Sequence, residues 1–385
     1  MENFDIMPMI FRDPVQEQRY AMLSQRPMLP TRYPDSSCME ALGIVPSVRH
    51  LCSQLQWDEY TEVMHVTYRN LTLEFLSSLN YEPYDGHASD DGYINFRIFG
   101  TEYTFNHKRF GDLLGFQTTY DASSELPMSY FLSRDVEKFW SDITCGGSPD
   151  PSTQISNKIH NPAFRYFQMI IAHTFLGKSD TDTHVSVEEI FFMYCTTQSH
   201  PVACGDFLIQ SLYLNARSVV SLIHVGSTVT HITSSLGLDR SLFHLTSYCS
   251  YTLMDIDFCL DRGLMRRSSF HPDQYRLLIE GETIHYFTLP DPQVTCVYNQ
   301  ANWAYAIESQ GETVDEQRIP PEAEHHPTPT RLRQELANVS LQVEVSDGTH
   351  AIEADILNNE IADLRHQIVE LRGSEVEETP LFPGH

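Results

Sequence analysis

Lysine is scarce in this chain of 385 residues, which has only Lys108, Lys138, Lys158 and Lys178. All basic residues together number 25 against 52 acidic ones, so the formal net charge is -27. Sequence-independent binding to nucleic acid depends on clustered lysine and arginine, and so does binding to anionic membranes. The composition therefore argues against both classes, whereas 41% hydrophobic and 20% charged residues are typical of a globular protein.

Long apolar runs and secretory features are also missing. No segment approaches the ~20 unbroken apolar residues of a membrane span. The start of the chain carries Glu2 and Asp5 where a secretory leader would be basic. The eight cysteines form no C-x-x-C pair. We therefore expect an intracellular protein, cytoplasmic or nuclear and not secreted, with reduced and mostly buried thiols.

Several catalytic and nucleotide-binding motifs are absent as well. The sequence has no G-x-S-x-G elbow, no G-x-x-x-x-G-K-[ST] loop and no H-E-x-x-H pair, and no G-x-G-x-x-G follows a strand. No catalytic, cofactor-binding or metal-binding residue is predicted, and the chain is interpreted as non-enzymatic. An enzyme with an unrecognised site is kept as a third alternative.

One cysteine and histidine cluster permits a metal-binding interpretation. Cys195, His200 and Cys204 form C-x4-H-x3-C, and thiolate with imidazole suits zinc. No fourth ligand lies nearby, so buried thiols are the preferred interpretation.

Two further groups of residues are weighed in the same way. Asp255, Asp257 and Asp261 would suit a hard cation, but their alternation with apolar residues favours solvent-facing carboxylates. His173 would suit a general base, but it lies in a strongly apolar helical segment without an identifiable nucleophile. A hydrogen-bonded core histidine is therefore preferred.

The apolar spacing predicts a mainly α fold with minor β structure. Residues 1–45 contain frequent prolines and are interpreted as an irregular N-terminal arm. Residues 46–300 are interpreted as a helical core. Ile94, Phe96 and Ile98 alternate with polar residues before Gly100, which predicts a β-hairpin, and residues 275–289 predict a second one.

Helix-start signals recur along the core. Asn161-Pro162 begins a segment that is apolar nearly all round and ends at Gly177, which predicts a central helix. Ser186 and Glu189 are spaced as a capping box. Further helices are expected at residues 47–55, 68–79, 107–114, 134–143, 206–220 and 229–236.

The C-terminal part differs in composition. Residues 301–330 are acidic and rich in proline, so they are interpreted as a disordered linker, and residues 373–385 as a disordered tail. Residues 331–372 are interpreted as an amphipathic coiled-coil helix that self-associates through a seam of apolar residues at heptad spacing, Leu357, Ile361, Leu364, Ile368 and Leu371. A single helix that folds back on the core is the alternative.

Residues 68–79, with the sequence YRNLTLEFLSSL, carry a family resemblance. They resemble the T-Y-x-x-L-T-L-E-F-L-S-S-L signature of the first-open-reading-frame protein of Athila-type plant LTR retrotransposons. Other blocks agree in order and spacing, among them FRIF at 96–99, LLGF at 113–116, IHNP at 159–162 and EEIFFM at 188–193. The resemblance covers roughly residues 30–300.

The resemblance implies a transposon-derived, gag-like structural protein of plant origin that acts through protein–protein contacts. It brings no catalytic residues and no cofactor. The chain lacks the C-x2-C-x4-H-x4-C zinc knuckle that many gag proteins use on RNA. A nucleic-acid-binding module is the alternative function, with Arg97, Lys108 and Arg109 near the first hairpin as its candidate residues.

Overall fold

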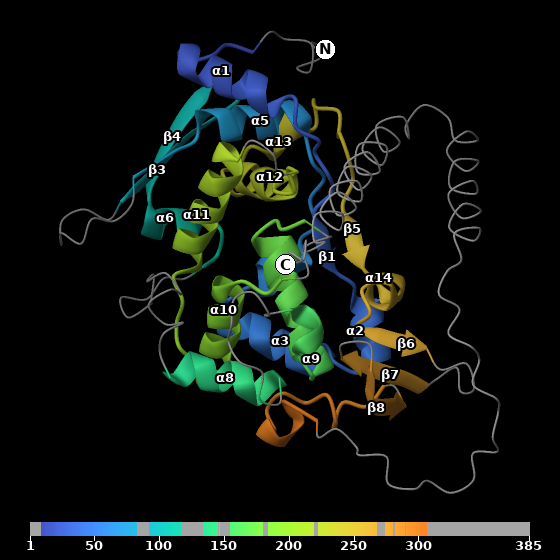
Figure 1. Ribbon diagram of the computed structural model, residues 1–385. Coiled ribbons are helices and arrows are strands. Elements are labelled where there is room, and N and C mark those ends of the chain that lie inside the picture. Colours follow the sequence, from blue (N-terminus) through green and yellow to red (C-terminus); the bar gives the residue numbers. More distant parts are fainter. Residues whose placement is uncertain are drawn as a thin grey trace, which may run out of the picture. The chain divides into compact units, whose positions relative to one another are not determined.

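The computed structural model describes most of the chain between residues 9 and 305. The described ranges are 9–82, 92–116, 134–144, 146, 155–179, 184–218, 222–267, 274–279, 282–288 and 290–305. The fold is mainly α-helical with short strands in small sheets, as the sequence predicted (Figure 1). The predicted linker beyond residue 305, the coiled-coil helix with its five seam residues and the tail lie outside the described residues.

The N-terminal segment is not an irregular arm, and here the sequence-based interpretation was wrong. Asp13 caps α1 (Pro14–Leu23), and β1 (Arg32–Pro34) leads into α2 (Ser36–Leu42), capped by Asp35. The prolines separate short elements, and one of them stands in the first turn of α1, where its missing N–H costs nothing. Leu23, Met28 and Tyr33 are buried. The segment is therefore part of the core.

Three helices follow, and each of them contributes buried side chains to the core. They are α3 (Val45–Gln54), α4 (Asp58–Glu62) and α5 (Arg69–Ser78). Every residue from Leu71 to Ser78 is buried, because α1, α12 and the first sheet surround α5. The predicted helices at 47–55 and 68–79 are thus confirmed.

The first predicted hairpin is confirmed and gains a third strand. β3 (Tyr93–Ile98) pairs antiparallel with β4 (Thr101–Asn106), and β2 (Asn80–Glu82) pairs with β3. The buried Glu74 carboxylate of α5 accepts hydrogen bonds from the backbone N–H groups of Phe99 and Gly100, at 2.9 and 2.7 Å. The hairpin turn is therefore anchored on the helix. Asn106 then caps α6 (His107–Leu113), as predicted.

The central helices follow the predicted starts closely. They are α8 (Arg134–Thr144), the short η3 (Ser156–Lys158), α9 (Pro162–Met169), η4 (Ile170–Phe175), α10 (Val187–Gln198), α11 (Cys204–Arg217), α12 (Gly226–Ser235) and α13 (Asp239–Leu242). The predicted central helix differs from a regular α-helix in its second half, η4, which is π-helical. Its residues are buried throughout, as the apolar pattern indicated.

The last described elements return to the N-terminal segment. β5 (Thr252–Met254) pairs in parallel with β1, and α14 (Ile256–Asp261) follows it. β6 (Met265–Arg267), β7 (Gln274–Ile279) and β8 (Glu282–Thr288) form an antiparallel sheet, and its β7–β8 pair confirms the second predicted hairpin. After η5 (Gln300–Asn302) comes Trp303, packed edge to face against Phe164. The core thus extends past residue 300.

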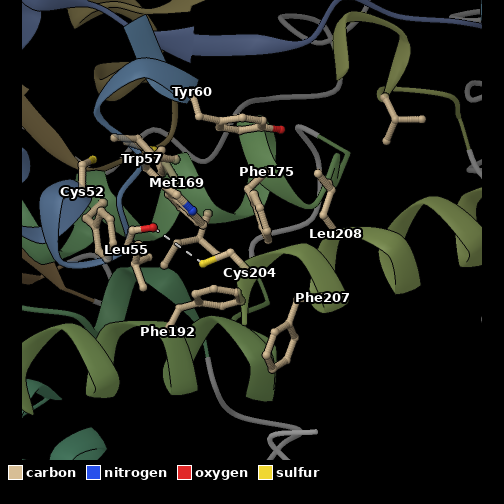
Figure 2. Packing of buried hydrophobic residues seen from close by; sticks show 14 of the residues in the cluster. Cys52, Leu55, Trp57, Tyr60, Met169, Phe175, Phe192, Cys204, Phe207 and Leu208 are labelled. Atoms are coloured by element: carbon tan, nitrogen blue, oxygen red, sulfur yellow. Dashed lines mark hydrogen bonds between the residues drawn. The ribbon is translucent and has the colours of Figure 1, made fainter. Parts of the chain in front are cut away.

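Aromatic side chains fill the centre of the core (Figure 2). Trp57 is fully buried and stacks on Phe175, with ring centroids 4.4 Å apart. Phe192 and Phe207 pack from α10 and α11, and the Cys204 thiol points at the Leu55 carbonyl. Large buried rings contribute most of the apolar burial per residue, so this cluster connects α4, η4, α10 and α11.

Arginines connect three of the helices at their C-terminal ends. Arg69 of α5 donates to the carbonyl of Ser24, the C-cap of α1, at 2.6 Å. Arg26, which follows α1, donates to two carbonyls at the end of α11, at 2.7 and 3.0 Å. Arg217 of α11 donates to the carbonyl of Leu79, the C-cap of α5, at 3.5 Å. Each cation meets the negative end of another helix dipole, which closes a ring of contacts around the three helices.

Candidate functional site

Arg97, the first of the predicted nucleic-acid contacts, lies inside the protein. Its guanidinium donates to the carbonyls of Ile10 and Gly100 and to the Gln16 side chain, at 2.8 to 3.0 Å. Only 7% of the residue is exposed. Arg97 therefore joins the N-terminal segment to the hairpin turn and does not face a ligand, which corrects the sequence-based prediction.

Lys108 and Arg109, the other two predicted contacts, both lie on α6. Lys108 is half-buried and Arg109 is exposed. The Arg109 backbone N–H donates to the capping side chain of Asn106, at 2.8 Å. Arg109 is thus at the surface, whereas Arg97 is buried, so the two residues do not face a common ligand.

The C-x4-H-x3-C residues do not gather as three metal ligands, although the Cys195 thiol acts electrostatically on Cys204. Cys195 and Cys204 are buried, and burial raises the pKa of each thiol to about 12. His200 is exposed in the connection between α10 and α11. Within the described ranges, no three histidine, cysteine or acidic side chains gather as metal ligands. The seven described cysteines are free thiols, five of them buried, as expected.

The other candidate groups take structural positions. Asp255, Asp257 and Asp261 are exposed, and Asp255 caps α14 through the backbone N–H of Phe258. His173 is buried in η4, where its Nδ1 lies 3.3 Å from the Lys178 carbonyl oxygen. Both preferred interpretations of the sequence, solvent-facing acids and a core histidine, agree with these positions.

Glu189 forms a buried polar cluster that the sequence suggested only in part. The Ser186 hydroxyl accepts from the Glu189 backbone N–H, as in a capping box. The Glu189 carboxylate, however, turns inward and accepts from Lys178 and Gln168, at 2.6 Å each. Burial raises the pKa of Glu189, and the Lys178 charge opposes that effect. This cluster connects α9, α10 and the segment after η4.

Two histidines far apart in sequence meet on the surface of the core. His65 Nε2 and His231 Nδ1 are 2.9 Å apart, so one ring donates to the other. Burial lowers the pKa of both, and for His231 burial and the neighbouring His65 lower it to about 4. Nothing in the spacing of the sequence indicated this pair.

One face of α1 exposes apolar side chains around a basic centre. Val15 and Met22 are 54% and 49% exposed, and their spacing places them on the same helix face as Arg19. Leu214 of α11, 62% exposed, neighbours Asn215, whose carbonyl accepts from Arg26. We call Val15, Arg19, Met22 and Leu214 the assembly face.

Arg19, the basic centre of this face, is in electrostatic contact with a second arginine, Arg217 of α11. Burial lowers the pKa of Arg19, and the charge of Arg217 lowers it further. Arg217 also lies over the ring of Tyr213, with its central carbon 4.9 Å from the ring centroid. Positive charge is therefore concentrated here, on a chain whose net charge is strongly negative.

A groove of about 290 Å³ lies between α8, α10 and η5. We call it the α8 groove. Its walls contain four residues of α8 at i, i+3, i+4 and i+7, two of α10 one turn apart, and two at η5, namely Asp135, Lys138, Phe139, Asp142, Tyr194, Gln198, Gln300 and Trp303. The helical spacing in α8 was visible in the sequence, but the partners from α10 and η5 were not.

None of the described helices has the length and apolar character of a membrane span. No curated protein and no solved structure matches the chain significantly. Residues 10–199 match the model of the ATHILA ORF-1 family, which supports the resemblance on which the gag-like interpretation depends. Over these residues, which include the helices from α1 to α10, the chain resembles the ATHILA ORF-1 family.

Proposed function

We propose that this chain is a non-enzymatic, retrotransposon-derived, gag-like structural protein that assembles through protein–protein contacts. The family match supplies the gag-like class. The observation that carries the assembly role is the assembly face. Val15 and Met22 are exposed beside Arg19 on α1, and Leu214 is exposed on α11 one turn before Arg217, whose charge acts on Arg19. Methionine and arginine are enriched at protein interfaces, whereas scattered charges dominate ordinary surfaces.

The partner proposed for this face is a second copy of the same chain, whose acidic residues would pair locally with its positive centre. Arg19 and Arg217 form a positive centre, whereas the molecule as a whole carries a net charge of -27. Pairing of these arginines with acidic residues of a neighbouring copy would offset part of the repulsion between two chains of the same net charge, and the apolar side chains would exclude water. The C-terminal seam (Leu357, Ile361, Leu364, Ile368 and Leu371) adds a separate contact in this proposal.

Light scattering of the purified full-length chain tests the assembly role. We expect a mass above that of the monomer, and a shift toward the monomer in a Met22→Glu/Leu214→Glu variant, because each substitution places a carboxylate in an apolar contact. Phe243→Glu is the matched control, since Phe243 is 84% exposed and lies outside the assembly face. A monomeric wild-type chain would contradict the proposal.

A chain ending at residue 328 separates the two contacts. If the seam residues associate, this shorter chain has a smaller assembly than the full-length chain, and the assembly-face variant reduces it further. Equal masses for the full-length and shortened chains would contradict the proposed coiled-coil contact and leave the assembly face as the proposed contact.

RNA binding at several salt concentrations tests nucleic-acid binding, the alternative function. Arg19 and Arg217 provide cations beside the ring of Tyr213, a combination that also suits single-stranded RNA. Binding of RNA that weakens steeply with salt and is lost in Arg19→Gln would place the function in that class.

A further inference from the structure

We propose that the α8 groove binds an arginine side chain presented by a basic peptide segment of a partner protein. The groove is separate from the assembly face, and the inference does not depend on the proposed assembly function. Three helical elements build its walls, α8, α10 and η5, so its shape is set by the packed core and not by a loop. Its volume of about 290 Å³ is at the lower limit for small-molecule sites, which suits one long side chain better than a cofactor.

The floor of the groove is aromatic and held in place. Phe139 is buried and packs edge to face against Tyr194 and Trp303, with ring centroids 6.0 and 5.7 Å apart. The indole N–H of Trp303 donates to the Val297 carbonyl, at 2.8 Å, which fixes the ring. Tyr194 and Trp303 are partly exposed, so both offer ring surface to a ligand. A flat cation gains most from such surfaces.

The rim of the groove favours a cation over an anion. Asp135 and Asp142 stand two turns apart on α8, and in the part of the chain that the structure describes neither has an ion-pair partner. Lys138 lies between them, which leaves one net negative charge among the side chains of the groove. The net charge of -27 on the whole chain adds to this preference.

Arginine fits these walls better than lysine. A guanidinium is planar, stacks on aromatic rings and pairs with a carboxylate through two parallel hydrogen bonds. The side-chain amides of Gln198 and Gln300 at the rim add acceptors for its remaining N–H groups. The stem of the arginine side chain would cover the Phe139 ring, and the peptide backbone would stay outside the groove.

Tryptophan fluorescence of the full-length chain measures this binding directly. Trp57 and Trp140 are buried, at 0% and 1% exposure, so Trp303 is the tryptophan that a ligand in the groove can reach. We expect acetyl-Gly-Arg-Gly-amide to cause a saturable change in emission that disappears in Trp303→Phe. The matching lysine peptide should bind more weakly, and the glutamate peptide should cause no change.

An Asp135→Asn/Asp142→Asn variant removes both rim carboxylates with little change in shape. We expect it to bind the arginine peptide at least about fivefold more weakly, from two solvent-exposed ion pairs. Glu137→Gln/Glu40→Gln is the matched control, because it removes two exposed acids outside the groove, one of them on α8. Equal affinities in the two variants, or equal affinity for the lysine and arginine peptides, would overturn the proposal.

Discussion

Two buried charged side chains, Arg97 and Glu74, stabilise the turn of the first hairpin. The Glu74 carboxylate accepts two hydrogen bonds from the hairpin turn, and Arg97 donates one to the turn and two to the N-terminal segment. A hydrogen bond to a charged group stabilises by about 1.5–3 kcal/mol, and a buried group that loses its partner is costly. Arg97 is thus a structural residue, because its guanidinium is occupied by three acceptors inside the protein and is not available to a phosphate.

The His65–His231 pair makes stability depend on pH. Burial and His65 lower the pKa of His231 to about 4 in the folded state, whereas the ordinary pKa of a histidine in the unfolded chain is about 6.5. As the pH falls, the folded state therefore takes up this proton at a lower pH than the unfolded state. The stabilisation is therefore complete above pH 6.5 and is lost as the pH falls toward 4.

His231→Asn tests this dependence, since the amide can replace Nδ1 in the contact with His65. We expect the free energy of unfolding of the wild type to fall between pH 7 and pH 5 by up to about 2 kcal/mol more than that of the variant. Urea denaturation at both pH values measures the difference. Parallel pH profiles would show that the pair does not titrate in this way.

At the scale of elements, glycines set the distance between helices. Gly205, in the first turn of α11, faces Gly111 of α6, and a Cβ atom added to Gly205 would lie 2.8 Å from the Gly111 Cα. The obstacle is backbone and cannot rotate away. Two helices thus pack closely at this point because neither carries a side chain there.

Gly205→Ala should therefore destabilise the protein, although alanine usually favours a helix by about 1 kcal/mol over glycine. We expect a net loss of about 1–2 kcal/mol in the free energy of unfolding, because overpacking costs about 1–3 kcal/mol. Phe243→Ala, at an exposed side chain outside the assembly face, is the control and should change stability little. A more stable Gly205→Ala variant would contradict this prediction and show that α6 and α11 can move apart to admit the methyl group without loss of stability.

At the scale of the whole molecule, the two ends of the described core are joined. β1 pairs in parallel with β5, so Arg32 lies opposite Thr252, which is 220 positions further along the chain. Asp35 and Asp255 then cap α2 and α14 directly after the paired strands, and the thiols of Cys38 and Cys259 meet at 3.8 Å. The N-terminal segment thus completes a sheet and a helix pair that begin far along the chain.

Deleting residues 1–35 should consequently abolish cooperative unfolding, because it removes α1, β1 and two partners of Arg97, leaving β5 unpaired. A chain ending at residue 328 is the control. It loses more residues but keeps the described core, and we expect its melting transition to stay sharp. Circular dichroism during heating measures both. A cooperative transition in the N-terminal deletion would restore the interpretation of an independent arm.

Local signals predicted local structure well. Asn161-Pro162, Ser186 and Asn106 each stand at a helix start because a capping side chain needs only the next two or three backbone N–H groups. The two hairpins were predicted because period-two alternation and a turn lie within one short stretch. The interpretation of residues 1–45 as an irregular arm was wrong, because frequent prolines indicate where helices and strands end. They do not indicate which other segments those elements pack against.

Sites built from distant residues escaped prediction. The helix starts, the hairpins, the acidity of the chain and the family resemblance follow from the order of residues alone, since each depends on neighbouring residues or on composition. The folded chain was needed to show that Arg97 is internal, that His65 meets His231, and that α8, α10 and η5 enclose a groove. The physical reason is that burial and charge pairing depend on which segments pack together, and side chains 166 positions apart carry no mutual signal in the order of residues.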